Sequence, residues 1–330
     1  MSIKATITGV GKYVPEKVLT NFDLEQMVET NDEWIRSRTG IEERHITAED
    51  EATSDMAVKA FKNLQEHYDV DPADIDCIVV ATVTPDMAFP STACLIQEAI
   101  GAKDAWGFDL SAACSGYLYA LETAARFIES GRYKKVLVVG ADTMSAITDY
   151  EDRNTCILFG DGAGVTLLEP TEKEGYGMLD SVLYADGSGA EYLYIPAGGS
   201  KRPASHETVD QKLHYLRQDG RTVFKYAVNG MANVTKEILE RNNLTGDDVA
   251  FFVPHQANKR IIDATAKKVG LRDEQVVVNI DKYANTTAAT IPMGIHELTS
   301  NNKIKDGDLL VVATFGAGFT WGAAILRWGK

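Results

Sequence analysis

Cys114 stands where an apolar segment turns through small residues into an amphipathic one. The local sequence is AWGFDLSAACSGYLYALE, and residues 115–130 show the three- and four-residue apolar spacing of a helix that ends at Gly131. Because a helix N-terminus presents unpaired N–H groups and the positive end of a dipole, it stabilises a thiolate, and we predict a nucleophilic cysteine with a lowered pKa. The alternative is a buried cysteine that packs as a small hydrophobic residue, and position alone does not separate the two.

Two further polar residues follow apolar segments in the second half of the chain. His255 comes directly after AFFVP and before the amphipathic residues 256–268, and Asn285 lies in the small-residue turn KYANTTAATIPMG. Parallel sheets collect functional groups at the carboxyl ends of their strands, so His255 suits a catalytic site. A histidine in a turn is often only a surface or structural residue, and an asparagine is often a helix cap, so these alternatives stay open.

The other cysteines carry no comparable signal. Without CxxC spacing they predict buried thiols rather than disulfides or a zinc site; they are Cys77, Cys94 and Cys156. The glycine-rich stretches 159–164 (FGDGAG) and 315–322 (FGAGFTWG) match neither phosphate-loop pattern, and close backbone packing explains them better. We therefore expect neither a metal nor a nucleotide-binding loop.

Continuous apolar runs indicate the strands that must position these residues. The runs CIVVATV, KVLVVGA and LLVVATF are separated by helical stretches, which predicts strands buried on both faces in mostly parallel sheets. Residues 73–85 and 247–258 look like copies of each other, and 133–142 with 157–170 echoes 306–328. We predict an α/β fold of two duplicated halves, 1–172 with the nucleophile and 173–330 with the histidine and asparagine. The polar stretch 196–220 breaks the pattern and is expected to be a lid or a mobile loop.

Composition excludes several classes of protein. Of 330 residues 45% are hydrophobic and 25% charged, which is typical of a globular protein, and the net charge of −15 argues against a nucleic-acid partner. No run of 18 apolar residues could span a membrane, and the N-terminus lacks the layout of a secretory signal. We expect a cytoplasmic protein.

Several motifs together resemble the β-ketoacyl-acyl carrier protein synthase III family of the thiolase superfamily. They are DLSAACSG, VPHQAN, YANTTAATIP and FGAGFTWG, with WIRSRTGIEERH at 34–45 and EDRNTCILFGDGAG at 151–164, and their order agrees over nearly the whole chain. The resemblance implies the five-layered αβαβα thiolase fold, a homodimer and a catalytic triad of Cys114, His255 and Asn285. It also implies an oxyanion hole formed by the backbone N–H groups of Cys114 and Ala317.

The implied reaction is a decarboxylating Claisen condensation that initiates type II fatty-acid synthesis. A short acyl-CoA such as acetyl-CoA and malonyl-acyl carrier protein would give 3-oxoacyl-acyl carrier protein, CO₂ and CoA, with no cofactor beyond the CoA thioester that serves as substrate. Relatives that elongate longer chains use a second histidine where this chain has Asn285, which favours the CoA-primed reaction. Thiolases carry a second catalytic cysteine near the last glycine-rich turn, and 315–322 contains none.

The resemblance also implies binding roles. For CoA and its pantetheine arm the residues are Trp34 and Arg153 around the adenine, Arg38 near a phosphate, and Phe224 and Asn258 along the tunnel. Phe89 would close the acyl pocket of the partner subunit across the dimer. For the acidic carrier protein the residues are Gln256, Lys259, Arg260 and Lys267, of which the last two share a helix face by their spacing. The alternatives are core packing, interface packing and a solvated helix face.

One departure from the family pattern concerns the final glycine-rich turn. The family commonly has three consecutive glycines there, whereas this chain has Gly316, Ala317 and Gly318, so a methyl group narrows the site. Other functions also remain open. They are a condensing enzyme or acyltransferase of secondary metabolism with the same triad, a cysteine hydrolase that releases free acid, and a non-catalytic scaffold for acyl carrier protein.

Overall fold

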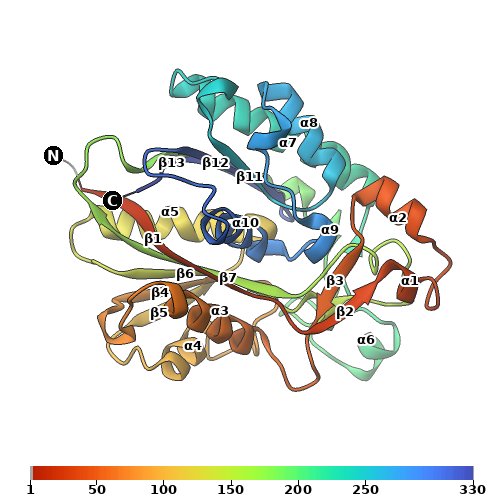
Figure 1. Ribbon diagram of the computed structural model, residues 1–330. Coiled ribbons are helices and arrows are strands. Elements are labelled where there is room, and N and C mark those ends of the chain that lie inside the picture. Colours follow the sequence, from red (N-terminus) through yellow and green to blue (C-terminus); the bar gives the residue numbers. More distant parts are fainter. Residues whose placement is uncertain (1–2, 330) are drawn as a thin grey trace.

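Two large mixed sheets dominate the computed structural model, which describes residues 3–329 (Figure 1). The first, five-stranded sheet has the order β1 (Lys4–Tyr13), β7 (Gly162–Thr171), β6 (Val136–Asp142), β4 (Cys77–Ala81) and β5 (Trp106–Leu110). The second, four-stranded sheet has the order β11 (Phe251–Pro254), β12 (Leu309–Gly316), β13 (Thr320–Arg327) and β8 (Gly177–Ala185). Each large sheet takes its strands from one of the two predicted halves.

Helices fill the space between the sheets and cover their outer faces. In the middle lie α5 (Gly116–Glu129) and α10 (Thr290–Ser300), which share one apolar core with both sheets (Figure 1). On the outer face of the first sheet lie α3 (Thr53–His67) and α4 (Thr92–Ile100), and on that of the second lie α7 (Gly220–Arg241) and α8 (Lys259–Val269). The predicted αβαβα layering is confirmed.

The strands alternate between the layers because successive side chains of a strand point to opposite faces. In β4, Cys77, Val79 and Ala81 belong to the central core, whereas Ile78 and Val80 face α3 and α4. Both faces are therefore buried, which is why these segments read as unbroken apolar runs.

Shorter elements complete the chain. The remaining helices are α1 (Asn21–Leu24), α2 (Asp32–Thr39), α6 (His206–Asp210) and α9 (Ile280–Tyr283), and the remaining strands form the pairs β2 (Lys17–Thr20) with β3 (Glu43–Ile46) and β9 (Leu193–Tyr194) with β10 (Arg217–Gln218). Single 3-10 turns occupy Pro72–Asp74, Ala113–Ser115, Met144–Ile147, Gly187–Gly189, Gly246–Asp248, Asp273–Gln275 and Thr287–Ala289. The segment 196–220 is more ordered than predicted, since it holds α6 and ends in β10. Between residues 3 and 329, no helix is both long and apolar enough to cross a membrane.

The strand registers confirm the internal duplication. In the first sheet Val136 of β6 stands opposite Cys77 of β4, and in the second Leu310 of β12 stands opposite Phe251 of β11. The strands β1, β7, β6 and β4 thus correspond to β8, β13, β12 and β11. The counterpart of β5 is reduced to an isolated parallel bridge between residues 252 and 276. The short connection from β7 to β8 contains the predicted boundary between residues 172 and 173, which stays a prediction.

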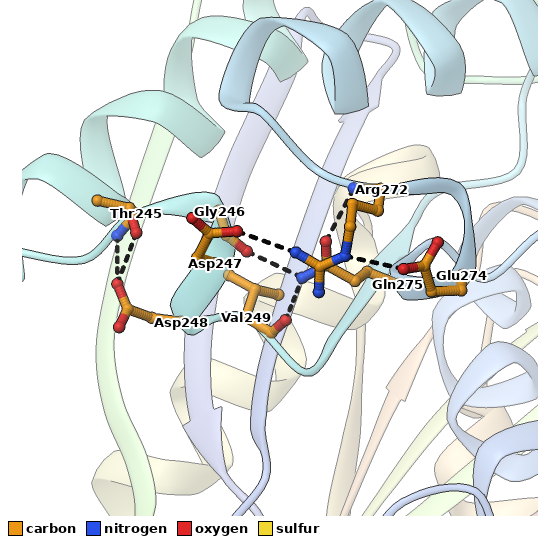
Figure 2. A network of polar contacts seen from close by, with 8 residues as sticks. All are labelled: Thr245, Gly246, Asp247, Asp248, Val249, Arg272, Glu274 and Gln275. Atoms are coloured by element: carbon orange, nitrogen blue, oxygen red, sulfur yellow. Dashed lines mark hydrogen bonds and ion pairs between the residues drawn. The ribbon is translucent and has the colours of Figure 1, made fainter.

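A polar network braces the entry to β11, the strand that leads to His255 (Figure 2). The buried Gln275 amide donates to the carbonyl of Gly246 at 2.9 Å and also to the carbonyl of Val249. On the surface, the Arg272 guanidinium reaches Asp247 at 2.9 Å and Glu274 at 2.8 Å. The buried amide satisfies backbone carbonyls that water cannot reach, whereas the ion pairs face solvent.

Replacing Gln275 should therefore destabilise the protein far more than removing the neighbouring ion pairs. We expect Gln275→Ala to lower the free energy of unfolding by about 2 kcal/mol, because it leaves buried carbonyls without donors. Arg272→Ala, whose side chain is 53% exposed, should change it by about 0.5 kcal/mol. Urea denaturation of both variants measures the difference, and equal effects would contradict this account of the network.

Candidate active site

A cavity of about 620 Å³ lies where the two halves meet, and its walls include Cys114, His255 and Asn285. Cys114 comes from the first half and the other two from the second, so neither half builds the site alone. The remaining walls are largely apolar, with Phe159, Phe224, Phe315, Ile157, Leu158, Leu193, Val223, Ala227 and Ile261 among the lining residues. The structure thus places the three predicted catalytic residues at one site.

The turn that carries Cys114 is held by the second half of the chain. Cys114 lies in the 3-10 turn Ala113–Ser115, which runs directly into α5, and Ala113 has a left-handed φ of +49°. The Thr314 hydroxyl donates to the Cys114 carbonyl at 2.9 Å, and the Ser115 hydroxyl donates to the Thr320 carbonyl at 3.0 Å. A strained backbone persists only where its surroundings fix it, and these bonds from β12 and β13 do so.

The thiol of Cys114 is not ionised at rest. The residue is 6% exposed, and burial, followed by the negative charge of Asp142, raises its pKa to about 12. The prediction that the helix N-terminus lowers this pKa is wrong, because removal of the thiolate from water outweighs the favourable dipole. The alternative, a cysteine that only packs in the core, does not explain why Cys114 lies on the wall of the cavity.

His255 follows β11 and is neutral. It is 2% exposed, and burial lowers its pKa to about 3. Its Nδ1 lies 2.8 Å from the Thr290 hydroxyl, which itself donates to the Thr287 carbonyl at 3.1 Å. The hydroxyl has one proton and uses it there, so it accepts from Nδ1–H. The lone pair is then on Nε2, which has no partner among residues 3–329 and belongs to a side chain on the cavity wall.

Asn285 is fixed by its backbone and by one end of its carboxamide. Its N–H donates to the Leu158 carbonyl at 3.0 Å, and its Oδ1 accepts from the Thr287 N–H at 2.9 Å. The N-cap of α10 is Ala289, but Oδ1 of Asn285 caps the first N–H of the 3-10 turn that leads into this helix, so the capping role and a free Nδ2 group occur together. No acceptor within residues 3–329 takes the Nδ2 hydrogens. They are the free polar group that Asn285 offers to the cavity.

The glycine-rich turn after β12 lies against the nucleophile turn. A methyl group on Gly316 would lie 2.8 Å from the Cys114 nitrogen, so this position requires glycine. Gly316 lines the cavity, whereas Ala317 does not. The oxyanion role of the Cys114 and Ala317 N–H groups stays a prediction. The structure supports only that the turn containing Ala317 lies close to the turn of Cys114, because Gly316 packs against the Cys114 nitrogen.

Comparisons with known proteins agree over the full length. A family model described as 3-oxoacyl-[acyl-carrier-protein (ACP)] synthase III matches residues 108–187, and the model of its C-terminal part matches residues 239–328. The β-ketoacyl-[acyl-carrier-protein] synthase III of Chlorobium chlorochromatii is 58% identical over 99% of this chain and 100% of that protein. This chain belongs to that family.

Solved structures of the family share its fold. The 3-oxoacyl-[acyl-carrier-protein] synthase III of Aquifex aeolicus has a TM-score of 0.90 at 45% identity, covering 98% of this chain and 100% of that one. The priming β-ketosynthase of the R1128 polyketide pathway has a TM-score of 0.91 at 34% identity, covering 99% of this chain and 96% of that one. The predicted thiolase-type α/β fold and condensing-enzyme class are thereby confirmed.

Most residues predicted to bind CoA line the same cavity; they are Trp34, Arg38, Phe224 and Asn258. Arg153 lies beside them, with its guanidinium carbon 5.5 Å from the centre of the Trp34 ring. This separation is too short for an adenine ring to stack between the two groups, so they would have to move apart to hold one. Asn258 already caps α8 through Oδ1 and donates from Nδ2 to the Arg38 carbonyl at 3.0 Å. Their roles toward CoA remain predictions.

The residues predicted to bind the carrier protein do not form one basic surface. Gln256 is 1% exposed, and its side-chain amide donates to the carbonyls of Pro254 and Val277. Its predicted role in binding the carrier protein is therefore wrong in this structure. Lys259 is held by Asp263 at 2.8 Å, and Arg260 lines the cavity above the Phe224 ring.

Lys267 and Phe89 lie away from the cavity. Lys267 lines a separate depression with acidic neighbours, among them Asp263, Asp273 and Glu274. Phe89 is 85% exposed and does not contribute to the cavity of its own chain. That position suits the predicted reach across a dimer, which nothing in a single chain tests.

Sequence reasoning missed several residues of the site. Arg221 at the start of α7 and Phe315 at the end of β12 line the cavity, and Thr290 holds the imidazole of His255. Thr290 lies five residues after Asn285 in the same motif, which is the signal that could have found it. Arg221 follows the polar stretch 196–220 and belongs to no motif. Among the described residues, no group of three or more His, Cys, Asp or Glu could hold a metal ion.

The high pKa of Cys114 predicts an unusual pH dependence of alkylation. Since only the thiolate reacts, the rate of modification by iodoacetamide should rise about tenfold per pH unit from neutral pH to at least pH 10. Peptide mass spectrometry follows Cys114, and the exposed Cys94 of the same chain controls for reagent supply. A rate that levels off near pH 8.5, as for an ordinary thiol, would contradict the burial effect.

Proposed function

We propose that Cys114 carries the acyl group in the reaction of this family, with His255 and Asn285 as its neutral hydrogen-bonding partners. The reaction condenses a short acyl-CoA with malonyl-acyl carrier protein to 3-oxoacyl-acyl carrier protein, CO₂ and CoA, and so initiates type II fatty-acid synthesis. The observation that carries the residue roles is the single cavity onto which all three open.

In the first half-reaction the acyl group moves from CoA to Cys114. Because the resting thiol is protonated, its proton passes to the Nε2 lone pair of His255 as the sulfur attacks the thioester carbonyl. The tetrahedral oxyanion would be stabilised by backbone N–H groups at the Cys114 turn. The CoA sulfur then leaves and takes the proton from Nε2, so that the imidazole is neutral again.

In the second half-reaction malonyl-acyl carrier protein loses CO₂ and leaves an enolate. Two uncharged donors face its thioester oxygen, the Nδ2–H of Asn285 and an Nε2–H of His255. The latter requires the other neutral tautomer, which forms by proton exchange with solvent once CoA has left, so that Nε2 gains a proton and Nδ1 loses one. The Thr290 hydroxyl then turns its own proton from the Thr287 carbonyl to Nδ1. The enolate carbon attacks the acyl-cysteine, and the released thiolate takes a proton from solvent.

The cavity supports this scheme over hydrolysis. Its walls are mainly aromatic and aliphatic side chains, which exclude water from the acyl-enzyme. A condensing enzyme of secondary metabolism would use the same site, since the identity of the polyketide enzyme, 34%, falls within the range of 28% to 58% found for the synthase III relatives.

Part of the cavity wall is basic, which suits the phosphates of CoA and of the carrier protein's prosthetic arm. Arg38, Arg221 and Arg260 line it, and none of them forms an ion pair within residues 3–329. This local positive charge is what an anionic substrate needs on a protein of net charge −15. We infer that the reaction needs no cofactor beyond its thioester substrates, and that it takes place in the cytoplasm.

We also propose a homodimer formed through the edge of the first sheet. Within the described chain β5 is an end strand, and its first residue, Trp106, is 42% exposed. The neighbouring loop presents Met87 at 47% and Phe89 at 85% exposure. Exposed apolar side chains next to an open strand edge are typical of a surface that is covered by another subunit.

An acyl adduct on Cys114 is the direct test of the proposed function. After incubation with acetyl-CoA, intact-protein mass spectrometry should find an acetyl group on the wild type and none on Cys114→Ala. Adding malonyl-acyl carrier protein should discharge the adduct and yield acetoacetyl-acyl carrier protein. A panel of longer and branched acyl-CoAs would define the primer, and absence of an adduct with every short acyl-CoA would exclude the priming role. Release of free acid instead of condensation product would favour a hydrolase.

Charge at the strand edge should disrupt the proposed dimer. We expect Trp106→Glu to shift the protein from dimer to monomer in sedimentation velocity, because a carboxylate would be buried in the interface. Phe22→Glu is the matched control, since Phe22 is 64% exposed but belongs to α1, across the molecule from β5 (Figure 1). A dimer that survives Trp106→Glu would place the interface elsewhere.

A further inference from the structure

The duplication gives the nucleophile turn a counterpart in the second half. The 3-10 turn Ala113–Ser115 leads into α5, and the 3-10 turn Thr287–Ala289 leads into α10. The first residue of each turn has the same left-handed φ of +49°. Ala113 therefore corresponds to Thr287, and Cys114 corresponds to Ala288. A β-branched residue such as Thr287 rarely adopts this conformation, so something must hold it there.

The registers also pair Gly316 with a buried aspartate. Because Val136 of β6 corresponds to Leu310 of β12, Asp142 at the end of β6 corresponds to Gly316 at the end of β12. Gly316 leaves the nitrogen of the nucleophile turn uncovered by a side chain. At the equivalent place the Asp142 carboxylate accepts from the Thr287 hydroxyl and approaches the Ala288 N–H at 3.4 Å. An internal anion thus occupies the position that corresponds to the oxyanion site.

Asp142 is held only by neutral donors. It is fully buried, and it accepts from the Val83 N–H at 2.7 Å and from the hydroxyls of Thr82 at 3.0 Å and Thr84 at 2.9 Å. No cation pairs with it among residues 3–329. Burial raises the pKa of Asp142, and the hydrogen bonds from Thr287 and from the donors named above oppose that rise. A buried carboxylate is costly unless its lone pairs are satisfied, and the donors that converge on this group fit its ionised, acceptor-only form.

Thr287 links this carboxylate to both neutral partners of Cys114. Its N–H donates to Oδ1 of Asn285, which turns the Nδ2 end of that amide toward the cavity. Its carbonyl accepts from Thr290, whose hydroxyl holds Nδ1 of His255. Thr287 therefore orients the Asn285 amide throughout, and it is linked to the His255 imidazole in the resting tautomer. Its own hydroxyl is bound by Asp142.

We propose that Asp142 is a positioning residue, which acts through Thr287 to orient the Asn285 amide toward the enolate. This rests on the proposed function. Asp142 touches no substrate, so its effect should appear in the second half-reaction, which is the step that needs the Asn285 donor. If the hydrogen bond between Asp142 and Thr287 served folding alone, its loss would lower the rates of both half-reactions together, or of neither.

The sharpest test compares Thr287→Val with Thr287→Ser. The first keeps the shape and removes the hydroxyl that Asp142 binds, whereas the second keeps the hydroxyl. Acylation of Cys114 by acetyl-CoA is timed by mass spectrometry, and condensation is timed from pre-acylated enzyme with malonyl-acyl carrier protein. We expect Thr287→Val to slow condensation by about 100-fold and acylation by less than about fivefold, and Thr287→Ser to restore most of the condensation rate.

The variant Asp142→Asn allows an electrostatic test, because the pH profile of Cys114 alkylation would not change if Asp142 had only a structural role. The negative charge of Asp142 opposes ionisation of Cys114. Of the other titratable groups on the cavity wall, His255 is neutral, and Arg38, Arg221 and Arg260 are the same in both variants. Removing the charge should shift the pH profile of Cys114 alkylation to lower pH, whereas Thr287→Val keeps the carboxylate and should leave the profile in place. Condensation should fall in both variants.

Two results would overturn the inference. One is equal condensation rates for Thr287→Val and Thr287→Ser, and the other is a parallel loss of both half-reactions that follows the loss of thermal stability. If Asp142→Asn does not fold, the Thr287 pair decides alone. A wild-type enzyme that is never acylated would defeat the proposed function itself, whereas normal acylation with no difference between the Thr287 variants would defeat only the role of Asp142.

Discussion

The active site depends on two close approaches between the ends of strands and the buried turns that they meet. A methyl group on Gly316 would lie 2.8 Å from the Cys114 nitrogen, and one on Gly140 would lie 2.4 Å from the Ala288 carbonyl oxygen. Both distances are shorter than van der Waals contact, so only glycine allows the sheets to come this near. This approach brings a cysteine of one half onto a cavity that it shares with the polar residues of the other.

The same packing sets the electrostatics of the site. It removes Cys114 and His255 from water, which raises the pKa of the thiol and lowers that of the imidazole, so that both groups are uncharged at neutral pH. Charge then arises only when a substrate is present to be attacked or decarboxylated. A dry site with neutral donors suits an enolate better than a site that holds a thiolate and an imidazolium at rest. Hydrogen bonds to the developing oxyanion are strong in such a site, and forming them needs no reorganisation of water.

Duplication explains how the chemistry is divided. The two halves repeat one strand order and one strained turn, yet the first half places a nucleophile in its turn and the second places hydrogen-bond donors around its own. Where the first turn faces a glycine, the second faces the Asp142 carboxylate. The two halves therefore contribute different groups to the cavity between them: the first half contributes the side proposed to carry the acyl group, and the second half contributes the side proposed to stabilise the enolate.

Much of this architecture could be predicted from the sequence because its signals are local. Unbroken apolar runs indicate strands buried on both faces, and small residues after a strand indicate the turns of Cys114 and Asn285, so the layers, the duplication and the three central residues were all predicted from neighbouring residues and family motifs. Such signals depend on a few consecutive side chains. They can therefore be recognised without knowledge of the fold.

Only the tertiary structure decided the protonation states and the contacts between distant residues. The pKa of Cys114 follows from its burial and from Asp142, which is 28 positions away in the chain, and these outweigh the local helix dipole on which the sequence prediction relied. Gln256 looks like a surface residue beside a helix, but it turns inward to the carbonyls of residues 254 and 277. The Thr290 contact with His255 and the link from Thr287 to Asp142 join residues 35 and 145 positions apart. Desolvation and long-range hydrogen bonds are properties of the packed chain, and no local pattern contains them.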